Sequence, residues 1–222
     1  MNRGKMMDQF KGMRLRDVIL FLILMALLPV AALGHQGLYE EKDTTGFLDA
    51  IVLPKPAVSY AVYMRLDHSG DVDYVSFKVD GAIPIKVSLL VPQRPEFLNY
   101  YPVFAIVGPG LPAPELEVPF ELPVGYGSVV MKSEPRPERE KFYEPFSSTH
   151  YYRGFEIFEQ VISEPGNYYI VVWHPEGEYG DYVVIYGEKE SFTPKEMLKT
   201  YRAISKVWTG KWGKFRGHPP TQ

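Results

Sequence analysis

The chain has 222 residues, of which 45% are hydrophobic and 23% are charged, and its formal net charge is −3. This length suits one domain with appendages, and this composition is typical of a globular protein rather than a disordered one. The absence of cysteine excludes disulfides, thiol catalysis, iron–sulfur clusters and thiolate zinc sites.

An uncharged apolar run from Val18 to Leu33 opens the chain, behind five basic residues among the first 16. Ala32 and Gly34 place small side chains at the two positions that a signal peptidase reads. The run is shorter than the roughly 20 residues that span a bilayer. We therefore predict a signal peptide over residues 1–34, cleaved before His35, with a retained membrane anchor as the alternative. Both assignments make the protein extracytoplasmic, either secreted or membrane-anchored.

The body of the chain has the period-2 pattern of β-strands. Residues 35–58 carry few periodic signals and are expected to form an extended lead-in, whereas apolar residues alternate in short segments over 59–192. No segment of helical period interrupts these segments, which disfavours parallel βαβ folding. We predict an all-β protein, an antiparallel β-sandwich of jelly-roll type. The eight predicted strands are 60–66, 72–79, 85–91, 103–107, 128–131, 155–162, 168–173 and 182–186.

Two charged or proline-rich segments interrupt the strands. Residues 109–126 hold too many prolines for a central strand and are expected to form a long loop. Residues 133–141 (SEPRPEREK) are expected to form a solvated loop.

Short motifs mark the two ends of the predicted sandwich. Residues 70–79 read GDVDYVSFKV, and residues 166–172 (GNYYIVV) and 180–184 (GDYVV) follow near its end. The first segment resembles the G-D-x-D-x-x-x-F-x-V opening of the pre-peptidase C-terminal domains of secreted bacterial and archaeal proteins, and the others resemble their closing strands. The resemblance implies a jelly-roll module without catalytic activity that binds substrate, matrix or a partner. Residues 109–155 are longer than the family pattern.

A basic amphipathic helix and tail are predicted over residues 193–222. Thr193, Pro194 and Glu196 form a capping box with proline at the first helical position, and an apolar stripe runs from Met197 to Trp208. Residues 195–216 hold seven basic residues and one acidic residue, whereas 35–194 hold 12 basic and 24 acidic residues. The helix can pack on its own domain, dock on a partner, or lie on an anionic membrane surface. The acidic body argues against nucleic-acid binding.

Two sets of residues are candidate metal ligands. Asp67, Asp71 and Asp73 fall in one turn, where carboxylates hold Ca²⁺ or simply solvate the turn. Some members of the resembled family bind calcium near this segment. His35 becomes the mature N-terminus after cleavage, and its amine and imidazole are a copper-ligating pair if a second histidine lies near.

An aromatic cluster is the candidate binding surface for a protein or a carbohydrate at the cell surface. Its rings supply contact area at low entropic cost, although core packing is the alternative for each of them. The predicted binding residues are Phe142, Tyr143, Phe146, Tyr151, Tyr152, Arg153, Trp208 and Trp212.

No catalytic motif stands out. There is no G-x-S-x-G nucleophile segment and no glycine-rich phosphate loop. The sequence predicts an exported binding module that is not an enzyme and has no cofactor, with calcium at the three aspartates as the alternative. Two alternatives stay open: an anchored subunit of a cell-envelope complex docked through the C-terminal helix, and a copper- or calcium-dependent extracellular enzyme. Three asparagines and no cysteine favour a thermophilic source.

Overall fold

The chain divides into two compact units, Met1–Gly34 and His35–Gln222. The computed structural model describes residues 14, 16–17, 20, 35–132, 135, 138–144, 147–153, 155–189 and 193–208. Most of the first unit, with the predicted signal peptide or anchor, lies outside these residues. Among the residues described, no helix has the length and apolar character that a bilayer span requires.

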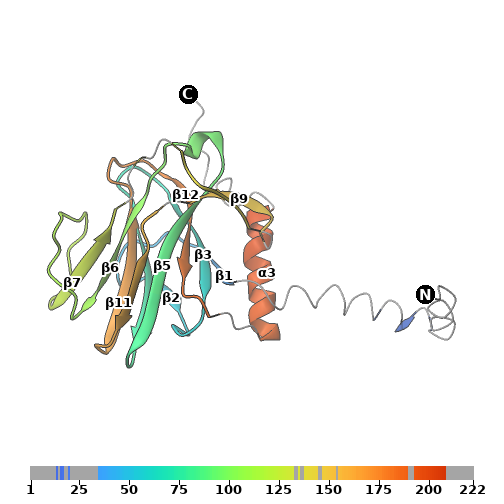
Figure 1. Ribbon diagram of the computed structural model, residues 1–222, viewed down its shortest axis with the longest axis horizontal. Helices are drawn as coiled ribbons and strands as arrows, with labels where there is room; N and C mark the ends of the chain where they lie inside the picture. The colour runs from blue at the N-terminus through green and yellow to red at the C-terminus, as the bar shows by residue number, and fades with distance from the viewer. Residues whose placement is uncertain are drawn as a thin grey trace, which may run out of the picture. The chain divides into compact units, whose positions relative to one another are not determined.

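The second unit is built from two β-sheets and one helix (Figure 1). Described strands of the first sheet run in the order β1 (Gln36–Tyr39), β3 (Tyr60–Leu66), β12 (Gly180–Tyr186), β5 (Ile83–Pro92), β9 (Thr149–Tyr152) and β8 (Lys141–Glu144), and β10 (Phe158–Ile162) also pairs with β5. Those of the second sheet run β2 (Ile51–Leu53), β4 (Val72–Val79), β11 (Gly166–Trp173), β6 (Val103–Pro109) and β7 (Tyr126–Met131). A 3₁₀ turn, η1 (Pro95–Phe97), follows β5. The fold is mostly β, as predicted.

Strand alternation decides which side chains enter the core. In β4, Val75, Phe77 and Val79 are buried, and the partner strand β11 contributes Tyr168 and Ile170. Successive residues of a strand point to opposite faces. The same parity places Asp73 on the inward face with Val75, which is the starting point for the site described below.

The lead-in is more ordered than the sequence predicts. It contains β1 and β2, which pair in parallel with β3 and β4, so the sheets are mixed and not antiparallel throughout. Segments of three and four residues are too short to display a period, and their partners lie more than 20 residues away in the chain. The hairpin of β8 and β9 was not predicted either, for the same reason, and the strand expected over 155–162 begins at Phe158.

The charged segment 133–141 is not solvated throughout. Arg139 is buried, and its guanidinium lies over the rings of Tyr101 and Tyr152 at 4.4 and 4.5 Å. Its Nη1 donates hydrogen bonds to the carbonyl oxygens of Phe97 (2.9 Å) and Tyr100 (3.1 Å). Aromatic faces attract a cation, so this arginine tolerates burial without a carboxylate partner among these contacts.

The proline-rich segment between β6 and β7 is a loop, as expected, and it packs on the outer face of the second sheet. The ring of Phe120 meets that of Trp173 edge-on at 5.7 Å and that of Phe47 at 6.0 Å. The carbonyl of Pro112 accepts a hydrogen bond from the N–H of Ser128, which covers part of the β7 edge.

The C-terminal helix α3 (Pro194–Trp208) packs on its own domain. Its first turn has the predicted capping box, in which the Glu196 N–H donates to Thr193 Oγ1 and the Thr193 N–H donates to Glu196 Oε2. Gly37 of β1 donates its N–H to Thr200 Oγ1 at 3.0 Å. A Cβ on Gly37 would lie 3.1 Å from Thr200 Cγ2, so glycine permits this close approach. Figure 1 shows α3 lying alongside β1.

Candidate metal centre

Carboxylates from two distant segments meet at the end of the sandwich where β1 and β3 finish. Parallel pairing of β1 with β3 carries Glu40 and Asp43 to this end. The turn between β3 and β4 brings Asp67 and Asp71, and the first residues of β4 bring Asp73. Five acidic side chains thus gather from stretches about 30 residues apart in the sequence.

The acidic groups form two overlapping sets that share Asp43, and each set is close enough to hold a cation. One ligand oxygen each of Glu40, Asp43 and Asp73 lie within 4.8 Å of one another. A second group within the same distance joins Asp43 to Asp71 and to a ring nitrogen of His68. Glu40, Asp71 and Asp73 are buried, whereas His68 is exposed.

Asp73 has an unfavourable electrostatic environment. Its Oδ2 accepts a hydrogen bond from Tyr182 OH at 2.6 Å, and its Oδ1 accepts one from Thr44 Oγ1 at 3.4 Å. Both donors are neutral hydroxyls. Burial, followed by the nearby Glu40 carboxylate, holds the pKa of Asp73 well above its ordinary value. The negative charge on this side chain is therefore destabilised in the protein alone.

Backbone contacts hold the surrounding acids in place. Asp71 Oδ1 accepts the N–H of Val72 at 2.8 Å, and Asp71 Oδ2 accepts the N–H of Asp67. Glu40 Oε2 accepts the N–H of Arg65 at 3.0 Å. These bonds orient the carboxylates without cancelling their charge.

The chemistry of this donor set fits a hard divalent cation. Carboxylate oxygens are the preferred ligands of Ca²⁺, which takes six to eight oxygens in flexible geometry. A bound cation also reverses the local pKa logic, because it stabilises the ionised form of each carboxylate. Glu40, Asp43, Asp71 and Asp73 are the residues that would hold the ion.

The structure brings two of the three predicted ligands into these groups. Asp71 and Asp73 were predicted ligands, and both belong to the cluster. The third predicted ligand, Asp67, has its Oδ1 3.7 Å from Arg65 Nε and does not join either group of three. Glu40 and Asp43 were missed, because only the parallel pairing of β1 reveals that they lie near the turn.

The predicted copper site is not assembled in the described residues. His35 is half-buried, and neither group of three metal-ligating side chains in the described ranges includes it. His68, in contrast, lies in a group with Asp43 and Asp71.

The predicted aromatic surface divides into a buried and an exposed part. Tyr151 and Tyr152 are buried, whereas Phe142 is half-buried beneath the Arg153 guanidinium at 3.6 Å. Tyr143 is 48% exposed, and its ring lies 4.8 Å from that of His150. Phe146, Trp212 and the side chain of Trp208 lie outside the described residues.

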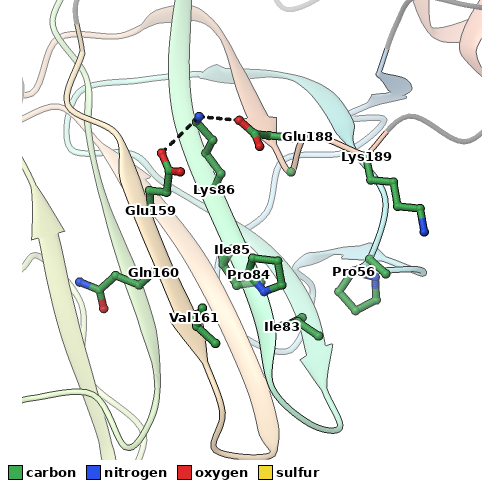
Figure 2. A pocket seen from close by; sticks show the side chains of 12 residues that line it. Pro56, Ile83, Pro84, Ile85, Lys86, Glu159, Gln160, Val161, Glu188 and Lys189 are labelled. Atoms are coloured by element: carbon green, nitrogen blue, oxygen red, sulfur yellow. Dashed lines mark hydrogen bonds and ion pairs between the residues drawn. The ribbon is translucent and has the colours of Figure 1, made fainter.

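A groove of about 610 Å³ lies at another place, on the outer side of β5 and β10 (Figure 2). Lys86 spans its rim, with Nζ 3.2 Å from Glu159 and 2.5 Å from Glu188. Pro84 and Val161 supply apolar lining, and the lining contains no histidine or serine. Sequence reasoning did not find this groove, because its lining comes from four separate segments.

Comparisons with known proteins give no match to a family or a curated sequence and a weak match in structure. No protein-family description matches the chain, and no curated protein matches it either. Among solved structures, the pre-peptidase C-terminal domain of a collagenase from Bacillus anthracis matches with 13% sequence identity, over 70% of this chain and 98% of that one. It belongs to the family that residues 70–79 and 166–184 resemble. The TM-score is 0.31, which is too low to carry an argument, so the fold rests on the strand pairing itself.

Proposed function

We propose that this protein is an exported β-sandwich module without catalytic activity, that it binds one Ca²⁺ ion at the carboxylate centre, and that it acts by binding a protein or a carbohydrate at the cell surface. The observation that carries the calcium assignment is the burial of Asp73 beside Glu40 with only neutral hydroxyl donors on its own oxygens. A buried ionised carboxylate is costly unless it is paired or coordinates a metal.

The position of the centre gives the ion a structural role. Glu40 and Asp43 belong to the segment that links β1 to β2, whereas Asp71 and Asp73 belong to the turn and strand that follow β3. One ion between them joins the N-terminal lead-in to the sandwich. Calcium sites of extracellular modules have dissociation constants of about 10⁻⁴ to 10⁻³ M. Such a site is filled outside the cell, which suits an exported protein.

The exposed part of the aromatic cluster is the proposed contact surface. Tyr143 offers an exposed ring on the β8–β9 hairpin beside the ring of His150, whereas Arg153 lies over the neighbouring Phe142. Tyrosine and arginine are enriched where protein surfaces bind partners. This surface is separate from the carboxylate centre, so calcium binding and partner binding can be tested independently.

Calorimetric titration of calcium tests the metal site. The full chain, purified in detergent and stripped with a chelator, is expected to bind one Ca²⁺ per chain. The variant Asp73→Asn is expected to lose this binding. The matched control is Asp80→Asn at the far end of the same strand, where the carboxylate is exposed and paired with Lys78. The absence of calcium binding by the unmodified chain, or retention of it by Asp73→Asn, refutes the assignment.

A further inference from the structure

The outward face of α3 is a cationic surface on an acidic domain. Lys195, Lys199 and Arg202 are exposed, at spacings of four and three residues, so they lie on one side of the helix. Leu198, which is 53% exposed, lies among them. We refer to these four residues as the cationic face.

The opposite side of α3 is already occupied. Thr200, Ala203 and Ile204 are buried, and Ala203 packs with Ala61 and Tyr63 of the first sheet. This side of α3 is therefore covered by the first sheet at Thr200, Ala203 and Ile204. The exposed side of the helix therefore presents positive charges and one apolar side chain, that of Leu198.

Acidic residues near the helix do not neutralise the cationic face. Glu196 is on the inner side, where its carboxylate is 2.7 Å from Lys55 Nζ, and Glu41 pairs with Lys206 beyond the face. In the described part of the chain, Lys195, Lys199 and Arg202 make no ion pair. Their charges face the solvent.

The carboxylate centre is too far from the N-terminal part of the cationic face to neutralise its positive charge. Lys55 and Glu196 mark the end of the domain where β3 begins, and the carboxylates lie where β3 ends. Seven residues of strand at about 3.3 Å each separate the two ends by roughly 20 Å. That is more than twice the Debye length of about 8 Å at physiological ionic strength, so the two regions act independently.

We propose that the cationic face of α3 binds the anionic surface of a lipid membrane. Charge complementarity is the first argument, because basic residues beside a bilayer of anionic lipids are attracted to it. The second argument is the path of the chain. The apolar run of residues 18–33 joins the domain at His35, and β1, which begins at the next residue, packs directly on α3. A chain that keeps this run in a bilayer tethers the domain to that membrane, which raises the local concentration of lipid headgroups around its basic residues.

The test measures whether lipid headgroups shield these lysines. The full chain is reconstituted into nanodiscs of phosphatidylcholine alone and of phosphatidylcholine with 30% phosphatidylglycerol, and each lysine is acylated in a timed reaction. We expect acylation of Lys195 and Lys199 to slow several-fold on the anionic nanodiscs and to recover in 0.5 M salt. Lys78, an exposed lysine of the second sheet, is the internal control and is expected to react equally on both.

A charge-removal variant makes the result specific. Replacement of Lys195, Lys199 and Arg202 by glutamine changes only exposed side chains, so folding is expected to be preserved. Each basic residue near an anionic surface strengthens binding about fivefold, so a second variant that keeps Lys199 as the reporter, Lys195→Gln with Arg202→Gln, is expected to lose the salt-sensitive protection of Lys199 on the anionic nanodiscs. Equal acylation on both nanodiscs overturns the proposal. Equal protection of these lysines on both nanodiscs also overturns the proposal, because something other than anionic lipid, such as an acidic protein, must then cover them. Calcium binding is unaffected by either outcome, so the two proposals fail separately.

Discussion

Two buried aspartates at the same end of the sandwich meet opposite electrostatic environments. Asp181 and Asp73 are both fully buried. Asp181 lies between two guanidinium groups, 2.7 Å from Arg65 Nη1 and 2.8 Å from Arg94 Nη1. Asp73 instead accepts from two hydroxyls and lies near other carboxylates. The first site is electrostatically complete within the chain, whereas the second would become complete with the proposed cation.

The largest effect is expected at the completed site. Asp181→Asn removes the anion between Arg65 and Arg94 and leaves the fully buried Arg65 without its main counter-charge. Loss of one partner of a buried ion pair costs about 3–5 kcal/mol. Urea denaturation followed by circular dichroism should show this loss equally in calcium and in chelator. A loss of stability that appears only in calcium or only in chelator would show that Asp181 is coupled to the proposed metal site. The contrast between Asp181 and Asp73 would then fail.

The effect of a substitution at Asp73 is expected to depend on calcium. In chelator, Asp73→Asn removes a disfavoured charge, so the variant should be at least as stable as the unmodified chain. With calcium in excess, only the unmodified chain gains the stabilisation by the bound ion, about 1–2 kcal/mol, so any advantage of the variant should shrink or reverse. The same denaturation experiment measures both values. Destabilisation of equal size in both media would mean that Asp73 serves packing alone.

The pH dependence in chelator follows from the raised pKa of Asp73. Between its unfolded value of 3.8 and its raised folded value, the folded protein binds a proton that the unfolded chain has released. Relative to the Asp73→Asn variant, the unmodified chain in chelator should therefore lose stability as pH rises from 5 to 7. The range avoids Glu196, whose pKa is lowered to about 2 by hydrogen bonds from Lys55 and Thr193 and whose contribution is lost only as pH falls below 4.5. The comparison with the variant also removes the contributions of His68, whose pKa is raised, and of His174, whose pKa is lowered by burial. A difference between the two chains that does not change with pH would contradict the raised pKa.

The smallest effect is expected at an exposed ion pair. Lys55 pairs with Glu196 of α3 at 2.7 Å, and the lysine side chain is largely exposed. Exposed pairs contribute about 0.2–1 kcal/mol, so Lys55→Ala should cost about 0.5 kcal/mol, and less at high salt. Urea denaturation at two ionic strengths checks this. A cost above about 2 kcal/mol would show that this pair, and not packing on β1, holds α3.

The strands were predictable where the alternation was long enough to see. The run from Val72 to Val79 displays four full alternations, and it forms β4 with Val75, Phe77 and Val79 inward. The lead-in strands were not predictable, because Gln36–Tyr39 and Ile51–Leu53 are short and take their register from distant parallel partners. The same holds for the proposed metal site. Asp71 and Asp73 lie in one short motif and were predictable, whereas Glu40 comes near them only through the pairing of β1.

The sequence also did not reveal which individual side chains are buried. Arg139 lies in a segment whose charges and prolines indicate a solvated loop, yet its guanidinium is enclosed by aromatic rings. Tyr151 and Tyr152 were predicted at a binding surface and are buried, whereas their neighbour Tyr143 is exposed. Composition within a segment does not reveal which side of a short hairpin faces the core.

The thermal unfolding temperature of the full chain in 5 mM calcium and in 5 mM chelator, at pH 7 and constant ionic strength, tests the metal site most directly. For dissociation constants of 10⁻⁴ to 10⁻³ M, bound calcium stabilises the fold by about 1–2 kcal/mol and should raise the unfolding temperature by roughly 3–8 °C. Magnesium at the same concentration should raise it less, because it requires a stricter octahedral geometry. Identical unfolding temperatures in calcium and chelator would contradict a cation at Asp73.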